Sequence, residues 1–168
     1  MNENHPMFDQ HRYTTNDLAK HIVIYDFDHY YMGSCLAELL RKRGHAVTLV
    51  TTASSVSAWT LMNNEMGNIR TRMIELGVNM VFENYLTGFS NGIAELASVY
   101  DGGGVRSVEA ASLVITGFRT ANDALYQELV ADRDRLSDAG INIVRSSGDC
   151  RVPGAIVHAV YSGYECAR

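Results

Sequence analysis

The sequence predicts an α/β fold in which a parallel, Rossmann-like sheet carries an antiparallel β insertion. Apolar strands alternate with helical patterns over 22–82. The segment 85–111 alternates apolar with polar residues and contains glycine turns, after which "SLVIT" (112–116) is again a buried strand. The chain has 168 residues, 46% of them hydrophobic and 20% charged, which is enough to bury a core and typical of an ordered domain.

Charge and composition exclude several classes of function. The formal net charge of -5 predicts neither nucleic-acid binding nor attachment to an anionic membrane. Residues 1–20 form a polar lead-in without a signal-peptide pattern, and no apolar run reaches about 18 residues, so we expect a cytoplasmic protein. Three cysteines without a C-x-x-C pair and six scattered histidines predict no protein-bound metal.

The first half of the chain reads as a βαβ unit followed by a further helix and strand. We expect a strand at 22–26, a helix at 32–43 and a strand at 45–51. The next helix ends at Gly77, and "VNMVF" (78–82) follows as a third strand. Turns at 90–92 and at 102–104 then join antiparallel strands within 85–111.

The last third of the chain is predicted to be mostly helical. After the strand at 112–116 we expect a helix over 122–140 with Asn122 as its N-cap, and a short strand at 141–144. A final helix follows the turn at Gly148 and Asp149.

Asp26 and Asp28 stand directly after the first strand and allow two interpretations. A strand followed by D-x-D resembles the haloacid-dehalogenase-type phosphatases, in which the first Asp attacks phosphorus and the second protonates the leaving group beside Mg²⁺. That chemistry also needs a lysine late in the chain, whereas the only lysines are Lys20 and Lys42. The phosphatase is therefore the alternative hypothesis.

The second interpretation is a dinucleotide-binding turn, G-x-G-x-x-G, that has lost its glycines. Asp26, Asp28 and Tyr31 then occupy the glycine places, shortly before Gly33. A like-charge pair at about 4 Å costs about 1 kcal/mol in water and about 4 kcal/mol at an effective dielectric constant of about 20, so the carboxylates disfavour a diphosphate. The second strand ends in two threonines at 51 and 52 instead of the acid or arginine that holds the ribose, so we expect no NAD(P) binding.

Several segments resemble one family in the same order along the chain: "VIYDFDHYYMGSCLAELLRKRGHAVTLVTTASSVSAWT", "RTRMIELGV", "SLVITGFRTANDALYQEL" and "GDCRVPGAIVHAVYSGYECAR". Together they are similar to the C-terminal part of flavoenzymes of the trimethylamine dehydrogenase and N-methylproline demethylase type. The resemblance implies that this chain is the last quarter of such an oxidoreductase, as a separate subunit, a truncated frame or an excised piece.

The same resemblance implies which parts of the enzyme lie in this chain and which lie in a partner. The FMN, the 4Fe–4S centre and all catalytic residues would lie in a flavin-bearing (β/α)8 barrel, which would be the partner of this chain. Residues 21–111 would be a degenerate NAD(P)-binding domain like that of the disulfide reductases. Residues 112–168 would be the C-terminal half of an FAD- or ADP-binding domain, with Gly148 and Asp149 near the ribityl or ribose group.

Two further features of the sequence each allow two interpretations. Trp59 lies in a Ser/Thr-rich loop, either as a simple surface aromatic or as a docking residue for an electron-transfer flavoprotein, which such enzymes use as acceptor. The chain could also be a stand-alone module that holds ADP or FAD at Gly148 and Asp149. The alternative to any ligand role for this pair is an ordinary helix-start turn.

Overall fold

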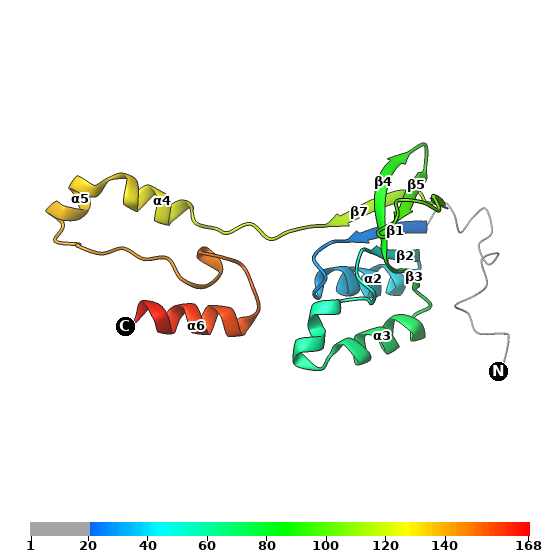
Figure 1. Ribbon diagram of the computed structural model, residues 1–168, viewed down its shortest axis with the longest axis horizontal. Coiled ribbons are helices and arrows are strands. Elements are labelled where there is room, and N and C mark those ends of the chain that lie inside the picture. Colours follow the sequence, from blue (N-terminus) through cyan, green and yellow to red (C-terminus); the bar gives the residue numbers. More distant parts are fainter. Residues whose placement is uncertain (1–20) are drawn as a thin grey trace. The chain divides into compact units, whose positions relative to one another are not determined.

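The computed structural model describes residues 21–168, which form two compact units (Figure 1). The first unit ends at Phe118, and the second is Arg119–Arg168. No helix within 21–168 is long and apolar enough to cross a bilayer.

A parallel sheet forms the centre of the first unit. Its strands are β1 (His21–Asp26), β2 (Ala46–Thr51), β3 (Asn79–Val81) and β7 (Ser112–Thr116), in the order β3-β2-β1-β7. All three pairings are parallel. The mixed α/β class with a parallel sheet, predicted from the sequence, is confirmed.

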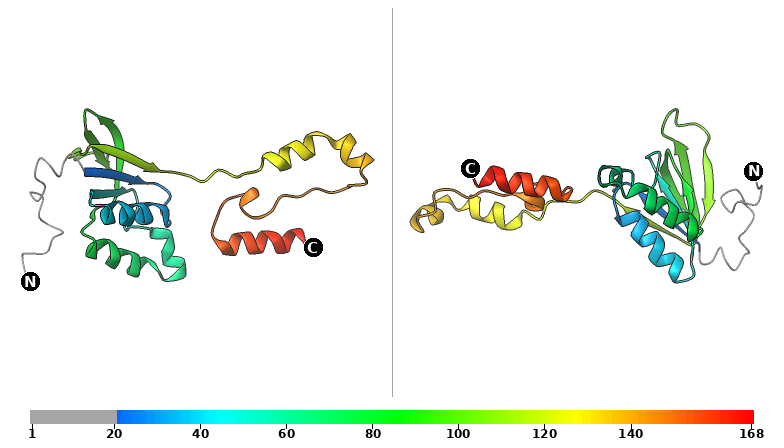
Figure 2. Two further views of the ribbon diagram at one scale, coloured as in Figure 1. Left: turned by 180° about the vertical axis from the view of Figure 1, so that it is seen from behind. Right: turned by 90° about the horizontal axis from the view of Figure 1, so that it is seen from below.

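Helices cover one face of this sheet. The helix α2 (Met32–Lys42) connects β1 to β2, and the 3₁₀ helix η1 (Ala58–Asn63) and α3 (Met66–Glu75) connect β2 to β3 (Figure 2). Their apolar side chains pack on the sheet in one cluster of buried residues, which includes Ile24, Ala37, Leu49 and Met73.

An antiparallel sheet covers the other face. It consists of β4 (Asn84–Ser90), β5 (Ile93–Ser98) and β6 (Arg106–Glu109) in sequential order. Asn91 and Gly92, with φ of 50° and 74°, form the two-residue turn between β4 and β5, as their sequence predicts. A second buried cluster joins the two sheets and includes Val23, Val50, Ala94 and Leu96.

The strand β7 belongs to the first unit. It pairs with β1 over Ile22–Asp26, so it completes the parallel sheet, and the border between the units lies after Phe118. The sequence predicted this border between residues 111 and 112, whereas in the structure it lies after Phe118, just beyond this strand.

The second unit contains short helices and no strand. They are α4 (Ala124–Ala131), α5 (Arg133–Asp138), the 3₁₀ turn η2 (Gly148–Cys150) and α6 (Ile156–Cys166). The strand expected at 141–144 is wrong, since these residues have no regular structure. None of the residues 119–168 is buried.

The single helix expected over 122–140 is interrupted. Asp132 has φ of -110° and ψ of 69°, and its side chain accepts a hydrogen bond from the N–H of Arg135, so it caps a new helix. Asn122 is not the N-cap of α4, because the helix begins after Asp123.

Candidate functional site

The candidate site lies at the carboxyl ends of the parallel strands. From β1 the chain proceeds to β2 and β3 on one side, whereas β7 pairs on the other side, so the strand order reverses between β1 and β7. In open α/β sheets, ligands bind in the crevice at such a reversal. Asp26 at the end of β1 and Thr116 at the end of β7 stand at this point.

The side chain of Asp26 is fully buried at this reversal of the strand order. Its Oδ1 accepts a hydrogen bond of 2.8 Å from the Thr116 hydroxyl. The backbone N–H groups of Asp28 and His29 lie 3.2 and 3.3 Å from the same oxygen. The second oxygen, Oδ2, is also buried and has no hydrogen-bond partner within residues 21–168.

This environment favours the neutral acid. Burial raises the pKa of the Asp26 carboxyl, because the charged form loses its hydration. The hydrogen bonds from Thr116 and from the loop, together with the nearby imidazole of His29, oppose that rise in pKa only in part. Asp26 is thus an internal group and faces no solvent.

Gly33 makes room for this carboxyl. It is buried in the first turn of α2, and a β-carbon at residue 33 would lie 2.6 Å from Cγ of Asp26 and 2.8 Å from Oδ2. Any side chain here would collide with Asp26. In the dinucleotide motif the third glycine lets the helix pack closely on the strand, and Tyr31 stands at that position in this chain. Here Gly33, two residues later, permits the close packing.

His29 connects the loop after β1 to the end of β2. Its backbone is left-handed, with φ of 56°, and its ring nitrogens Nδ1 and Nε2 lie 3.1 and 3.3 Å from the hydroxyl oxygens of Thr51 and Thr52. The carbonyl of His29 also accepts a 3.0 Å hydrogen bond from the N–H of Trp59. Nothing in the sequence around His29 distinguishes it from the other five histidines. The only sequence signal for this contact is the pair of threonines that its ring meets, Thr51 and Thr52.

Tyr31 points away from the crevice. Its hydroxyl donates to the carboxylate of Glu65 and accepts a 2.7 Å hydrogen bond from Asn63. The bond to Glu65 raises the pKa of the Tyr31 hydroxyl. Tyr31 therefore attaches the start of α2 to the end of η1 and to the N-cap of α3. Asp28, by contrast, contributes its backbone N–H to the carboxyl of Asp26.

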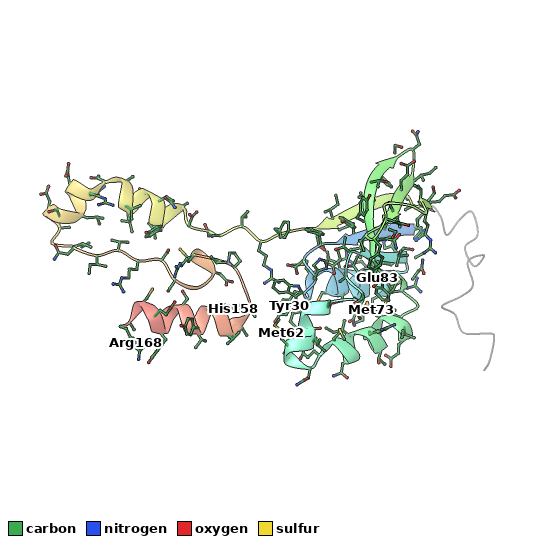
Figure 3. All side chains as sticks on the ribbon, viewed as in Figure 1. Tyr30, Met62, Met73, Glu83, His158 and Arg168 are labelled. Atoms are coloured by element: carbon green, nitrogen blue, oxygen red, sulfur yellow. The ribbon has the colours of Figure 1, made fainter. Side chains whose placement is uncertain are left out.

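Trp59 lies on η1, where the sequence suggested a loop. Its side chain is 56% exposed, beside two further exposed apolar residues of the same helix, Leu61 and Met62. Figure 3 shows Met62 at the outer edge of the first unit and Met73 inside it. We call Trp59, Leu61 and Met62 the η1 patch.

Gly148 and Asp149 lie in the second unit, ahead of α6. Gly148 has φ of 62°, and its N–H donates to the Ser162 hydroxyl over 3.1 Å. The exposed Asp149 accepts a 3.3 Å hydrogen bond from the N–H of Gly154. The pair thus shapes the turn that leads into α6, and Asp149 also lines an open depression with Arg119, Thr120, Asn122, Cys150 and Pro153.

Comparison with known proteins identifies the family of this chain. Residues 9–127 match the model of a family described as the OYE-like second alpha/beta domain. Dimethylamine dehydrogenase of Hyphomicrobium sp. (strain x) is 27% identical over 168 residues, which covers 90% of this chain and 23% of the relative.

Two solved structures have the same fold. Histamine dehydrogenase from Rhizobium sp. 4-9 is 37% identical, with a TM-score of 0.79 over 89% of this chain and 23% of that one. 6-Hydroxypseudooxynicotine amine oxidase from Pseudomonas geniculata N1 is 32% identical, with a TM-score of 0.75 over 86% of this chain and 21% of that one. The chain spans less than a quarter of the length of each of these relatives.

The resemblance to enzymes of the trimethylamine dehydrogenase type is confirmed at the level of the family. The match spans the parallel sheet, the antiparallel insertion and the start of the second unit, and the named relatives are oxidoreductases of amines. From its fold and from these matches, we conclude that the chain belongs to the family of OYE-like second alpha/beta domains.

Proposed function

We propose that this chain is the nucleotide-domain portion of a flavin-dependent amine dehydrogenase or demethylase, has no catalytic group of its own, and binds no NAD(P). The observation that carries the proposal is the burial of Asp26 in the crevice where a dinucleotide of this fold would bind. The amine-oxidising relatives support the class of the parent enzyme.

The chemistry of the crevice opposes a dinucleotide. A carboxyl group stands where backbone N–H groups would meet a pyrophosphate, and no acidic residue ends β2 to bind a ribose diol. The fully buried Asp26 also opposes the phosphatase hypothesis, since a nucleophile must reach its substrate.

Titration of the whole chain with NADH and with NADPH, followed by nicotinamide fluorescence and by calorimetry, tests the absence of binding. We expect no saturable signal with either nucleotide. A micromolar dissociation constant, which corresponds to about -8 kcal/mol, would overturn this part of the proposal.

The second unit supports a partner for this chain. Its residues are all at least partly exposed, and they include large apolar side chains on α4, on α6 and between them: Leu125, Ile143, Ile156, Val157, Val160 and Tyr161. A folded unit seldom leaves so much apolar surface in water. We infer that a flavin-bearing (β/α)8 barrel, as a chain or a domain, covers this surface.

Gly148 and Asp149 are the residues proposed to hold FAD or ADP. The left-handed Gly148 turns the backbone toward α6, and the exposed carboxylate of Asp149 suits a ribose or ribityl hydroxyl. FMN and a 4Fe–4S centre are assigned to the barrel. When bound there, they would supply the electron transfer.

The test of this arrangement is reconstitution with the barrel protein of the parent enzyme. We expect a stable complex that retains ADP or FAD, and we expect Asp149→Asn to lower that retention more than Asp134→Asn, which changes an exposed aspartate of α5. Equal retention by both variants would remove Asp149 from the site.

The η1 patch is the proposed docking surface for an electron-transfer flavoprotein. Its tryptophan is more than half exposed, and its backbone is fixed by the bond to His29. Aromatic anchors on fixed backbone are typical of binding surfaces. In the reconstituted enzyme, Trp59→Ala should slow electron transfer to the flavoprotein but not to a small artificial acceptor, and an unchanged rate with both acceptors would exclude docking at Trp59.

A further inference from the structure

The loop after β1 already has an acceptor for its backbone N–H groups. In a dinucleotide turn these groups point to the pyrophosphate. Here the N–H groups of Asp28 and His29 point to Oδ1 of Asp26, at 3.2 and 3.3 Å. The carboxyl of Asp26 thus takes the position of an acceptor oxygen that a ligand would otherwise supply.

The end of β2 is occupied in a similar way. A ribose would present two hydroxyl groups to the residue that ends this strand. In this chain, the two ring nitrogens of His29 lie 3.1 and 3.3 Å from the hydroxyl groups of Thr51 and Thr52. The imidazole of His29 therefore contacts both threonine side chains that could otherwise have contacted a ribose.

A local turn explains only part of this arrangement. An aspartate often accepts hydrogen bonds from the N–H groups two and three residues ahead, without any link to a binding site. This local preference of aspartate does not account for the hydrogen bond between Asp26 and Thr116, which are ninety residues apart. It also does not account for Gly33 of α2, whose missing side chain leaves room for the carboxyl. Nor does it explain the contact of His29 with β2.

We propose that Asp26 and His29 are internal occupants of the nucleotide crevice, with the carboxyl in the place of a phosphate oxygen and the imidazole in the place of the ribose. The inference deepens the proposed function, since it rests on the absence of NAD(P) binding and names the two side chains responsible. Their removal should expose the N–H groups of the loop and the threonine hydroxyls to a ligand.

The test compares variants of the full chain by titration with NADH and with NADPH. The double variant D26G/H29G should bind NADH with a dissociation constant at least about tenfold below the highest concentration at which the unaltered chain shows no saturable binding, with the calorimetric signal as readout. Asp26→Asn is the matched control, because it replaces the ionisable carboxyl by an amide of nearly the same size, and we expect it to behave like the unaltered chain.

Each outcome has a distinct meaning. Saturable binding of NADH by the unaltered chain would overturn the absence of NAD(P) binding on which the inference rests. A folded double variant that binds no better than the unaltered chain would overturn only the internal-occupant proposal. Tight binding by Asp26→Asn would also overturn it, because the amide fills the same space as the carboxyl.

A second variant decides the matter if the double variant does not fold. His29→Gly alone suits the left-handed backbone at this position, where φ is 56°. It opens only the end near β2, so we expect weaker but measurable binding of NADH. No gain in NADH binding by this variant would overturn the role of His29.

Discussion

Cγ of Asp26 lies within 2.6 Å of the position that a β-carbon at Gly33 would occupy. The two residues thus depend on each other: the carboxyl can be buried only because residue 33 has no side chain. Because Asp26 ends β1 and Gly33 lies in the first turn of α2, their contact also sets the approach of the helix to the sheet.

The first prediction concerns this contact. Gly33→Ala should lower the free energy of unfolding by about 1–3 kcal/mol or more, the usual range for overpacking, because Asp26 cannot move aside within the core. Urea denaturation measures the change. Gly67→Ala is the control, since Gly67 is exposed on α3 with no atom within 4 Å of its added β-carbon. It should raise stability by about 0.5–1 kcal/mol. Equal effects of the two substitutions would contradict the close contact.

The pKa of Asp26 predicts a pH dependence of stability. Because the folded state raises this pKa, it binds the proton more tightly than the unfolded state. The contribution is therefore fully present below the ordinary pKa of aspartate and is lost as the pH rises through the folded-state pKa. The loss amounts to about 1.4 kcal/mol for each tenfold difference in proton affinity between the two states. Denaturation at a series of pH values should show this loss, and Asp26→Asn should abolish it. An unchanged slope in the variant would assign the titration to another group.

His21 should act in the opposite direction. Burial lowers the pKa of its imidazole, against a smaller opposing effect of a backbone hydrogen bond with Glu109, and its Nε2 lies 2.9 Å from the Thr48 hydroxyl. The folded state thus favours the neutral ring, so its contribution is fully present above the ordinary pKa of histidine, about 6.5. It decreases below that value and is lost as the pH falls through the lowered pKa of the folded state. His21→Gln retains a polar side chain without this titration. Measured in the Asp26→Asn background, it should flatten the remaining dependence of the free energy of unfolding on pH in the acid range. A persistent dependence would show that another group titrates.

Hydrogen exchange should separate the two units. Residues of β1 and β2 are mostly buried, whereas none of the residues 119–168 is buried, so amides of the second unit should exchange far faster. Mass spectrometry of peptides from the isolated chain checks this difference. Addition of the proposed barrel partner should slow exchange in the second unit and leave β2 unchanged. Comparable protection of both units in the isolated chain would argue against a partner that covers the second unit.

Much of the first unit could be predicted because its signals are local. The apolar strands, the turn at Asn91 and Gly92 and the stop at Gly77 follow from side-chain pattern and backbone preference. The second unit was harder to predict because it lacks a buried face. The apolar residues 141–144 have no neighbouring strand within 119–168, and Asp132 restarts a helix that periodicity alone would continue.

The sequence predicted part of the candidate site. The acids after β1 and the threonines after β2 marked its place. The burial of Asp26 depends on Thr116, ninety residues later, and the left-handed conformation of His29 depends on contacts with β2. Such long-range relationships leave no local pattern in the residues concerned.

The pairing of the first and last strands of the parallel sheet has a consequence during synthesis of the chain. On the ribosome β1 emerges long before β7, so one of its edges stays unpaired while the helices and the antiparallel sheet are still being made. Until Thr116 arrives, the carboxyl of Asp26 lacks its strongest donor and remains hydrated. Closure of the unit is therefore a late, non-local event, which slows folding and leaves an open strand edge available to other nascent chains.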